Sequence, residues 1–600
     1  MTGKLTAALV AAVLLSACGG APRAGTPEKD GGNGGNGGNG GNTVRTDAGA
    51  VRGTVTAEHR IFQGIPYAAP PVGELRWSSP RPVAPWPGTR DATRPGGRCP
   101  QVGSDYAKVA GSDEDCLFLN VTAPRTPAAS GEGRPVMVWI HGDGALGSGD
   151  LTDVRAMVTR GDVVVVTINY RLGVFGGFGY PGLAGSGTYG LQDQQAALRW
   201  VRRNAAAFGG DPGNVTVFGV SWGALSIGGH LTSPGAEGLF DRAVLQSGEG
   251  MMDMLAGSMG EGVPGYPAYA WRTAGEVEEM GGYVAPMLGC EDLRCLRALP
   301  VERILKVPQI MNMFQSYAYG NETLPQLPSA ELRAGRGHPV PVISGATRDE
   351  HRLFVGMRYD LAGRPITARG YGRLLRTAFG ADAARVAAEY PPAGYGSPSL
   401  AWAAVITDRM WARATFEQNR LLSRKAPLYA YRFADRRAPM FLPLRTDFPF
   451  GAFHAADLPY LFTERNVTLT PAQRGLSGQM ISYWTNFART GDPNGAGLPR
   501  WERFDGAARV PYTQSLEPGA VRPVDYAAGH NLAFWPSPSW PDQAGRAAGG
   551  AVSSGRFHGS VPDVAIPRAT WETLLAPGAG AARPRRAGVC SMGIVREWLE

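Results

Sequence analysis

The chain has 600 residues, of which 43% are hydrophobic and 18% charged, and its formal net charge is +8. A chain of this length can bury an ample core, and no Pro/Gly-rich linker divides its middle, so we expect one large domain. Basic residues form no run with interleaved aromatic residues and no segment reaches 18 apolar residues, which excludes a nucleic-acid partner and a membrane-spanning body.

The N-terminus predicts export. Lys4 precedes an apolar stretch over residues 5–15, which is too short to span a membrane and is typical of a signal-peptide core. The stretch leads into Leu-Ser-Ala-Cys ending at Cys18, which resembles the bacterial lipobox, whose cysteine is lipidated. Residues 1–18 are therefore expected to be a lipoprotein signal peptide, and residues 19–43, with their Gly-Gly-Asn repeats, a flexible tether. We expect a protein that is lipid-anchored to the outer face of the bacterial cell membrane, or secreted.

Strands and helices are expected to alternate along the body, as a parallel sheet requires. Apolar residues at helical spacing predict a helix over residues 189–208, which Gly209 and Gly210 then break. A second helix is expected over residues 223–231. Short apolar runs predict strands at residues 136–140, 163–166, 215–218, 242–245, 342–343 and 428–433.

One of these strands ends in the motif Gly-Val-Ser-Trp-Gly at residues 219–223. A strand that ends in Gly-x-Ser-x-Gly and turns directly into a helix is the nucleophile elbow of α/β-hydrolases. The glycines allow a sharp turn that exposes the hydroxyl of Ser221 at the carboxyl edge of the sheet. The pentapeptide alone is weak evidence in a glycine-rich chain, and a serine after a strand can also serve as a helix cap.

A hydrolytic serine needs a histidine base and an acid that orients it, and in this fold the acid and histidine follow the serine along the chain. Glu350 follows a predicted strand and is the candidate acid, although it could also be a solvated loop acid beside Asp349. The histidines that come more than 100 residues after Ser221 are His351, His454, His530 and His558.

From about residue 44 to residue 535 the chain resembles the type-B carboxylesterase family, which includes cholinesterases and bacterial para-nitrobenzyl esterases. The matching segments occur in the family's order, which makes the resemblance specific. They are FQGIPYA at 62–68, EDCLFLNV at 114–121, NYRLG at 169–173, GLQDQ at 190–194, QSG at 246–248 and FARTGDP at 487–493.

The resemblance implies the α/β-hydrolase fold, an α/β architecture with a large, mostly parallel central sheet and helices on both faces. It also implies that Ser221 is the nucleophile, Glu350 the acid and His454 the base of a serine esterase acting on small carboxylic esters. No metal or cofactor is implied, and we expect a monomer. The same family contains adhesion proteins without a nucleophile, so an inactive or weakly active cell-surface binding protein is the alternative.

The chain departs from the family around the expected oxyanion hole. The family usually has His-Gly-Gly-Gly after a strand and Gly-Glu-Ser-Ala-Gly at the elbow. Here Asp143 stands in place of a glycine, Val220 in place of the glutamate and Trp222 in place of the alanine. By position, the backbone N–H groups of Asp143, Gly144 and Trp222 are the expected oxyanion donors. Asp143 would oppose the oxyanion if its carboxylate pointed inward, and the Trp222 ring would either narrow the acyl pocket or pack away from it.

Four cysteines match disulfide positions of the family, namely the pairs Cys99/Cys116 and Cys290/Cys295. Such bridges persist outside the cytoplasm, in agreement with export. Cys590 is left without an expected partner and lies in residues 536–600. Because that segment is rich in Gly, Ala, Pro and Arg, we expect it to be a disordered extension with no assigned role.

Overall fold

The computed structural model describes residues 41–104, 109–128, 133–463 and 466–535. Cys18, Cys590, the expected signal peptide, nearly all of the tether and the C-terminal extension lie outside these residues, so the expectations for them stay predictions. In the part of the chain that the structure describes, no helix is both long and apolar enough to cross a membrane.

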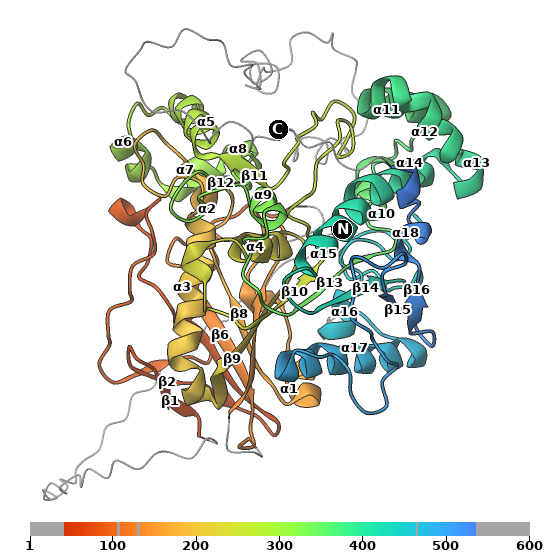
Figure 1. Ribbon diagram of the computed structural model, residues 1–600. Coiled ribbons are helices and arrows are strands. Elements are labelled where there is room, and N and C mark those ends of the chain that lie inside the picture. The colour runs from red at the N-terminus through yellow and green to blue at the C-terminus, as the bar shows by residue number, and fades with distance from the viewer. Residues whose placement is uncertain (1–40, 105–108, 129–132, 464–465, 536–600) are drawn as a thin grey trace, which may run out of the picture. The chain divides into compact units, whose positions relative to one another are not determined.

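One large sheet organises the described body (Figure 1). Among the described residues it has eleven strands, of which the seven neighbours from β15 to β8 run parallel, while the outer strands pair antiparallel. In spatial order the strands are β16 (Arg522–Val524), β15 (Thr513–Leu516), β14 (Leu428–Phe433), β13 (Val342–Thr347), β10 (Arg242–Gln246), β9 (Gly210–Val220), β7 (Arg134–Ile140), β8 (Val164–Ile168), β6 (Phe118–Pro124), β4 (His59–Pro66) and β3 (Thr54–Val55).

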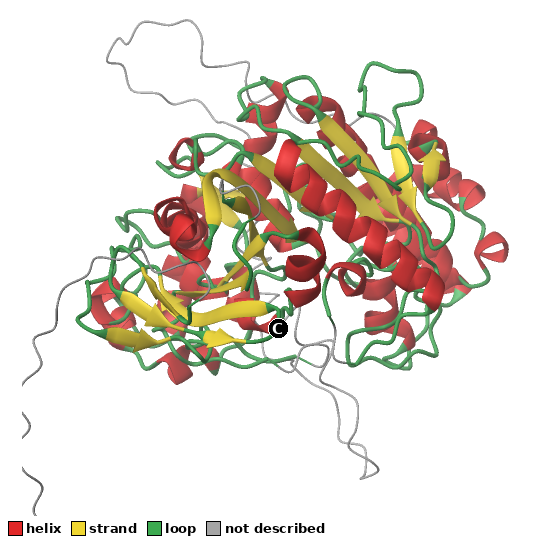
Figure 2. Cartoon of the chain, turned by 90° about the horizontal axis from the view of Figure 1, so that it is seen from below, coloured by secondary structure: helices red, strands yellow, loops and turns green. Residues whose placement is uncertain are grey.

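Helices cover both faces of this sheet, as Figure 2 shows from below. One face carries α1 (Arg155–Gly161) and α17 (Pro471–Thr490), and the other carries α3 (Tyr189–Asn204), α4 (Trp222–His230) and α15 (Arg413–Leu422). The expected fold class, an α/β-hydrolase with a large and mostly parallel central sheet, is confirmed.

The strand sequences explain why both faces are covered. Along β7, Val136 and Val138 join one buried cluster with α3 and α4, whereas Met137 and Trp139 join the other with α1 and α17. Successive side chains of a strand point to opposite faces, so a continuous apolar run buries apolar surface on both. Each large apolar side chain that is fully buried in this way stabilises the fold by roughly 1.5–3 kcal/mol.

The predicted helices and strands are present, and most of them begin or end at other residues than predicted. The helix expected over residues 189–208 is α-helical to Asn204 and then tightens into a 3-10 turn, which Gly209 closes at φ 86°. Strand β9 begins at Gly210, five residues before the prediction, because Gly210 already pairs with Arg134 of β7.

Smaller elements surround the sheet. The remaining strands are β1 (Thr43–Arg45), β2 (Ala50–Arg52), β5 (Thr89–Asp91), β11 (Trp271–Thr273) and β12 (Tyr317–Tyr319). The remaining helices are α2 (Gly173–Gly177), α5 (Ala274–Met287), α6 (Leu293–Ala298), α7 (Val301–Leu305), α8 (Gln309–Met313), α9 (Pro328–Arg333), α10 (Arg352–Val355), α11 (Ala368–Phe379), α12 (Ala383–Glu389), α13 (Pro392–Tyr395), α14 (Pro398–Ile406), α16 (Leu458–Leu461) and α18 (Tyr526–Gly529).

The second glycine of the elbow is required by close packing, which gives a first testable prediction. A Cβ on Gly223 would lie 2.1 Å from the carbonyl oxygen of Ile140 and 2.8 Å from that of His141. Gly223→Ala is therefore expected to lower the free energy of unfolding by about 3 kcal/mol or more, as measured by urea denaturation. Gly228, in the same helix, is the matched control because a Cβ there has no atom within 4 Å. Gly228→Ala should leave stability unchanged or raise it by up to about 1 kcal/mol. Equal effects of the two changes would contradict the packing argument.

Candidate active site

The candidate site lies where parallel strands of the sheet end. Ser221 follows β9, Glu350 lies three residues after β13, and the loop that begins at His141 follows β7. The carboxyl ends of parallel strands meet at one edge, and ligands bind there in open α/β sheets. A cavity of about 770 Å³ lies at this edge, and both Ser221 and His454 line it.

The elbow holds Ser221 in a strained backbone conformation, with φ 54° and ψ −120°. The turn is fixed on both sides, because the N–H of Ser221 donates to Gln246 at 2.8 Å and its carbonyl accepts the N–H of Leu225 at 2.9 Å. A Cβ on Gly219 would lie 2.7 Å from the Ile140 carbonyl oxygen, so the chain leaves β9 in close contact with β7. Strain of this kind costs about 1–3 kcal/mol and persists only where the surroundings impose it.

His454 and Glu350, which are 104 residues apart in the sequence, are in direct contact. The Nδ1 atom of His454 lies 2.6 Å from Oε2 of Glu350, and the other carboxylate oxygen accepts the N–H of Thr347 at 2.6 Å. Glu350 is fully buried, and the His454 ring packs against Trp411 and Phe354 at centroid distances of 4.8 and 5.3 Å. With Nδ1 on the carboxylate, Nε2 is the nitrogen left for a proton transfer within the cavity.

The other acid and histidine candidates have structural partners. Asp349 pairs with Arg436 at 2.8 Å and accepts the N–H of Ala452, so it does not face the histidine. His351 lies between the Ser258 carbonyl and the Trp411 indole N–H, and burial lowers its pKa to about 3. His530 pairs with Asp408 at 2.8 Å, and His558 lies outside the described residues.

The loop after β7 carries two of the three expected oxyanion donors, Asp143 and Gly144, and both have a positive φ, 77° and 75°. Oδ1 of Asp143 accepts the N–H groups of Ala145 and Leu146, each at 3.2 Å, so the carboxylate is directed at its own loop. The Asp143 carboxylate therefore stabilises this turn. A Cβ on Gly142 would lie 3.2 Å from Cβ of Ser221, which places the loop beside the serine.

Trp222 follows the serine and is the first residue of α4. The residue is only 4% exposed, and its ring packs with Tyr269 and Tyr317, each at a centroid distance of 5.9 Å. Atoms of the ring lie within 3 Å of where a Cβ on Gly144 would be, so the indole also presses against the oxyanion loop. Trp222 is among the residues that line the cavity, while most of its surface is packed against neighbouring side chains.

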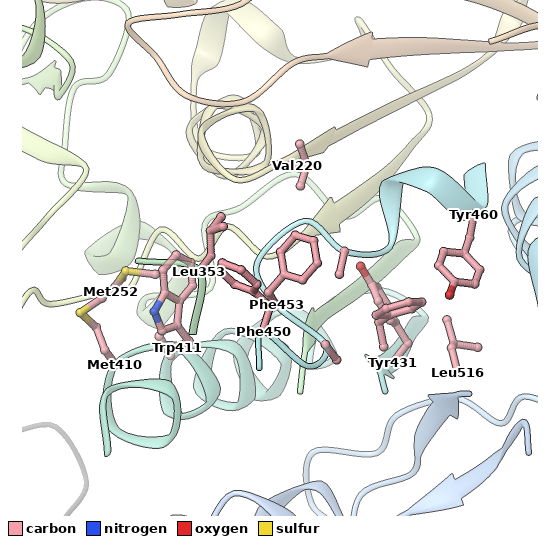
Figure 3. Close-up of a cluster of buried hydrophobic side chains, with 14 of the residues drawn as sticks. Val220, Met252, Leu353, Met410, Trp411, Tyr431, Phe450, Phe453, Tyr460 and Leu516 are labelled. Atoms are coloured by element: carbon pink, nitrogen blue, oxygen red, sulfur yellow. The ribbon is translucent and has the colours of Figure 1, made fainter. Parts of the chain in front are cut away.

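The rest of the cavity wall is largely apolar and rich in sulfur. Met252 and Met410 gather around Trp411, with Leu353 nearby, as Figure 3 shows. Further lining residues are Met254, Met259, Met357, Met440, Phe354 and Phe441. Methionine side chains are flexible and polarizable, so such a wall adapts to apolar groups of different shape.

The sequence interpretation missed a buried acid close to this site. Glu249 is 2% exposed, follows β10 by three residues, and accepts the hydroxyl of Thr415 at 2.7 Å. Burial, together with the nearby charge of Glu350, raises the pKa of Glu249 to about 8. Its place just after a strand of the parallel core is the same signal that selected Glu350, and it could have been found by that rule.

Glu249 gives a prediction about stability and pH. Its folded pKa of about 8 lies above the ordinary value of 4.5, so folding favours the protonated acid. That stabilisation is complete below pH 4.5, where the unfolded chain is also protonated, and it is lost as the pH rises toward 8; it amounts to at most about 5 kcal/mol. Glu249→Gln should therefore flatten the fall in unfolding free energy between pH 5 and pH 9, as measured by urea denaturation. Parallel curves for the two proteins would contradict it.

The order of the strands, the serine elbow after a central strand and the histidine–carboxylate pair at the carboxyl edge of the sheet together define an α/β-hydrolase. The sequence model of the carboxylesterase family matches residues 40–535, and the chain belongs to that family. It is a serine hydrolase that cleaves carboxylic esters.

Known relatives agree with this assignment. Para-nitrobenzyl esterase of Bacillus subtilis (strain 168) is 34% identical over 467 residues, covering 75% of this chain and 90% of the relative. Pyrethroid hydrolase Ces2a of Mus musculus is 33% identical, covering 76% of this chain and 83% of the relative. The solved structure of a thermophilic PNB esterase superposes with a TM-score of 0.67 at 30% identity, covering 82% of this chain and 99% of that one.

The structure also contains the two disulfides that the family resemblance implies. Cys99 is bonded to Cys116, and Cys290 to Cys295. In the described part of the chain, no group of three or more His, Cys, Asp or Glu side chains is arranged to hold a metal ion.

Proposed function

We propose that the enzyme hydrolyses its esters through Ser221, His454 and Glu350 by way of an acyl-enzyme intermediate. The observation that carries this proposal is the 2.6 Å contact of Glu350 with Nδ1 of His454, in a cavity that Ser221 also lines. The strained elbow supports it, because residues held in strained backbone conformations cluster at active sites.

In the first step His454 removes the proton of Ser221, whose oxygen attacks the ester carbonyl. Glu350 holds the imidazole in the tautomer with its proton on Nδ1 and stabilises the imidazolium that forms. The alcohol then leaves with the proton from His454. Water deacylates the serine through the same groups in reverse order.

The proposed oxyanion donors are the backbone N–H groups of Asp143, Gly144 and Trp222. Trp222 is the first residue of α4, so its N–H has no acceptor within the helix and the helix dipole favours negative charge there. The carboxylate of Asp143 is held by two N–H groups of its own loop, which reduces the opposition that it offers to an oxyanion.

The proposed substrates are neutral esters, with small ones as the starting point and bulkier apolar ones within reach of the cavity. A volume of about 770 Å³ lies in the range of sites for drug-sized ligands. Asp143 is the only carboxylate side chain among the described residues of the lining, and it is engaged with its own loop. The two disulfides favour an oxidising compartment as the place of action, in line with the expected export.

Labelling with an organophosphate tests the nucleophile directly. The protein should hydrolyse para-nitrophenyl acetate, butyrate and octanoate, and a fluorophosphonate should stop turnover at one equivalent. Peptide mass spectrometry is expected to place the label on Ser221. A folded protein that turns over none of the esters, or a label on another residue, would contradict the proposal.

A further inference from the structure

One glutamine side chain from another segment forms hydrogen bonds to the loop that carries the proposed oxyanion donors. Gln101 is 2% exposed, and its Oε1 accepts the N–H of Gly147 at 2.8 Å. Its Nε2 donates to the carbonyl of the same residue at 2.9 Å, and also to the carbonyl of Cys99 at 3.0 Å. The amide therefore pairs with both backbone groups of Gly147, as a neighbouring strand would.

Gly147 needs such a partner. Its φ is 129°, a conformation that only glycine adopts readily, and a Cβ there would lie 2.3 Å from Nδ1 of His141. A carboxamide is the neutral side chain that offers one donor and one acceptor in the geometry of a peptide group. Gln101 is buried and Gly147 is half-buried, and the Gln101 amide supplies a partner for both backbone groups of Gly147.

Direct contacts connect Gly147 to the proposed oxyanion donors Asp143 and Gly144. The His141 ring lies against Gly147 and stacks on Tyr170, with centroids 4.5 Å apart, while the Tyr170 hydroxyl donates to the His141 carbonyl at 2.8 Å. On the far side of the donors, the carbonyl of Gly144 accepts the N–H of Gly173 at 2.8 Å. Asp143 lies between His141 and Gly144, the two residues that these contacts hold. A shift of Gly147 that moved the His141 ring would therefore also move the proposed oxyanion donors.

Gln101 is in turn held by the first disulfide loop. It lies two residues after Cys99, and its backbone bridges that of Gly111 across the loop that Cys99 and Cys116 close. A second contact joins the chain beside the disulfide loop to the chain just after Gly147, because Arg98 pairs with Asp150 at 2.6 Å. Val109, also within the disulfide loop, lines the catalytic cavity.

We propose that Gln101 is a positioning residue, which fixes the oxyanion loop through Gly147 and is itself held in place by the Cys99–Cys116 disulfide. The inference rests on the proposed function, since it takes Asp143 and Gly144 as oxyanion donors. A misplacement of a catalytic group by about 1 Å costs about a hundredfold in rate. Loosening this loop should therefore act on the transition state far more than on substrate binding.

Gln101→Met tests the proposal, because methionine has a similar length and makes none of the three hydrogen bonds. We expect kcat for para-nitrophenyl butyrate to fall about 10- to 100-fold while KM changes less than threefold. The inhibition constant of an alkyl trifluoromethyl ketone, which forms the tetrahedral adduct, should rise by a similar factor. The matched control is Gln195→Met, which removes the hydrogen bond of another buried glutamine to Ser233. That change should lower stability and leave both kinetic constants unchanged.

The disulfide is tested with the second bridge removed, in a Cys290→Ser/Cys295→Ser variant. Dithiothreitol then converts Cys99–Cys116 to two thiols and is itself oxidised to its cyclic disulfide. We expect reduction to lower kcat of this variant, and to lower it much less when Gln101→Met is also present. If the Gln101→Met variant did not fold, reduction of the folded protein would remain as the test.

Parent values of kcat and of the ketone inhibition constant in Gln101→Met would overturn the proposal, as would equal losses in the Gln195→Met control. If reduction lowered kcat by the same factor with and without Gln101→Met, the proposed role of the disulfide in holding Gln101 would be overturned. The failure of the proposed function would look different: the parent itself would neither turn over the ester nor take up the fluorophosphonate label on Ser221.

Discussion

Ser221→Ala is expected to lower kcat for para-nitrophenyl butyrate by about 10⁵-fold or more. The change removes the atom that attacks the ester, so neither His454 nor the oxyanion donors have a nucleophile to assist. Nucleophile and base act as a unit, so adding His454→Ala to this variant should cost little more. The measurement is steady-state hydrolysis followed at 405 nm, with active-site titration of the parent as reference.

A second serine provides the control. Ser482 lies on α17, outside the cavity lining, and Ser482→Ala should retain the parent rate. Circular dichroism should show an unchanged fold for Ser221→Ala, whose main-chain strain stays the same. Residual activity above about 1% in the Ser221→Ala variant would mean that another group performs the attack, and the proposed triad would be wrong.

Glu350→Gln is expected to lower kcat by about 10³- to 10⁴-fold with little change in KM. One carboxylate oxygen accepts the N–H of Thr347, so the amide oxygen of glutamine will take that place. The NH₂ group then faces Nδ1 of His454, where the other carboxylate oxygen now lies at 2.6 Å. As a donor it favours the tautomer with the proton on Nε2, which leaves no base toward the serine, and the stabilising charge is lost as well.

The adjacent acid is the matched control for this change. Asp349→Asn weakens the pairing with Arg436 and Arg352 and is expected to lower the free energy of unfolding by about 1–3 kcal/mol. Its kcat should fall less than tenfold, because Asp349 does not contact the histidine. The two variants would be compared by kcat/KM between pH 6 and pH 9. If Asp349→Asn lost more activity than Glu350→Gln, the assignment of the two acids would be reversed.

Much of the fold could be predicted from the sequence, because local residue patterns determine where many of its strands and turns lie. The run at residues 428–433 gave a strand with correct ends, since the strand is buried on both faces and five of its six residues are apolar or aromatic. Glycines that no side chain can replace marked the turn at Ser221. The ends that the sequence missed are those set by partners, as at Gly210, where pairing with Arg134 extends β9.

Within the site, the sequence by itself determined the residue types and their order: a serine at an elbow, then an acid after a strand, then histidine candidates. Only the tertiary structure decided which of them meet. Glu350 faces His454 and Asp349 faces Arg436, although the two acids are neighbours in the chain, because consecutive side chains leave a loop in different directions. The direction of the Asp143 carboxylate, the packing of Trp222 and the hold of Gln101 on Gly147 likewise follow from contacts between segments that the chain order does not bring together.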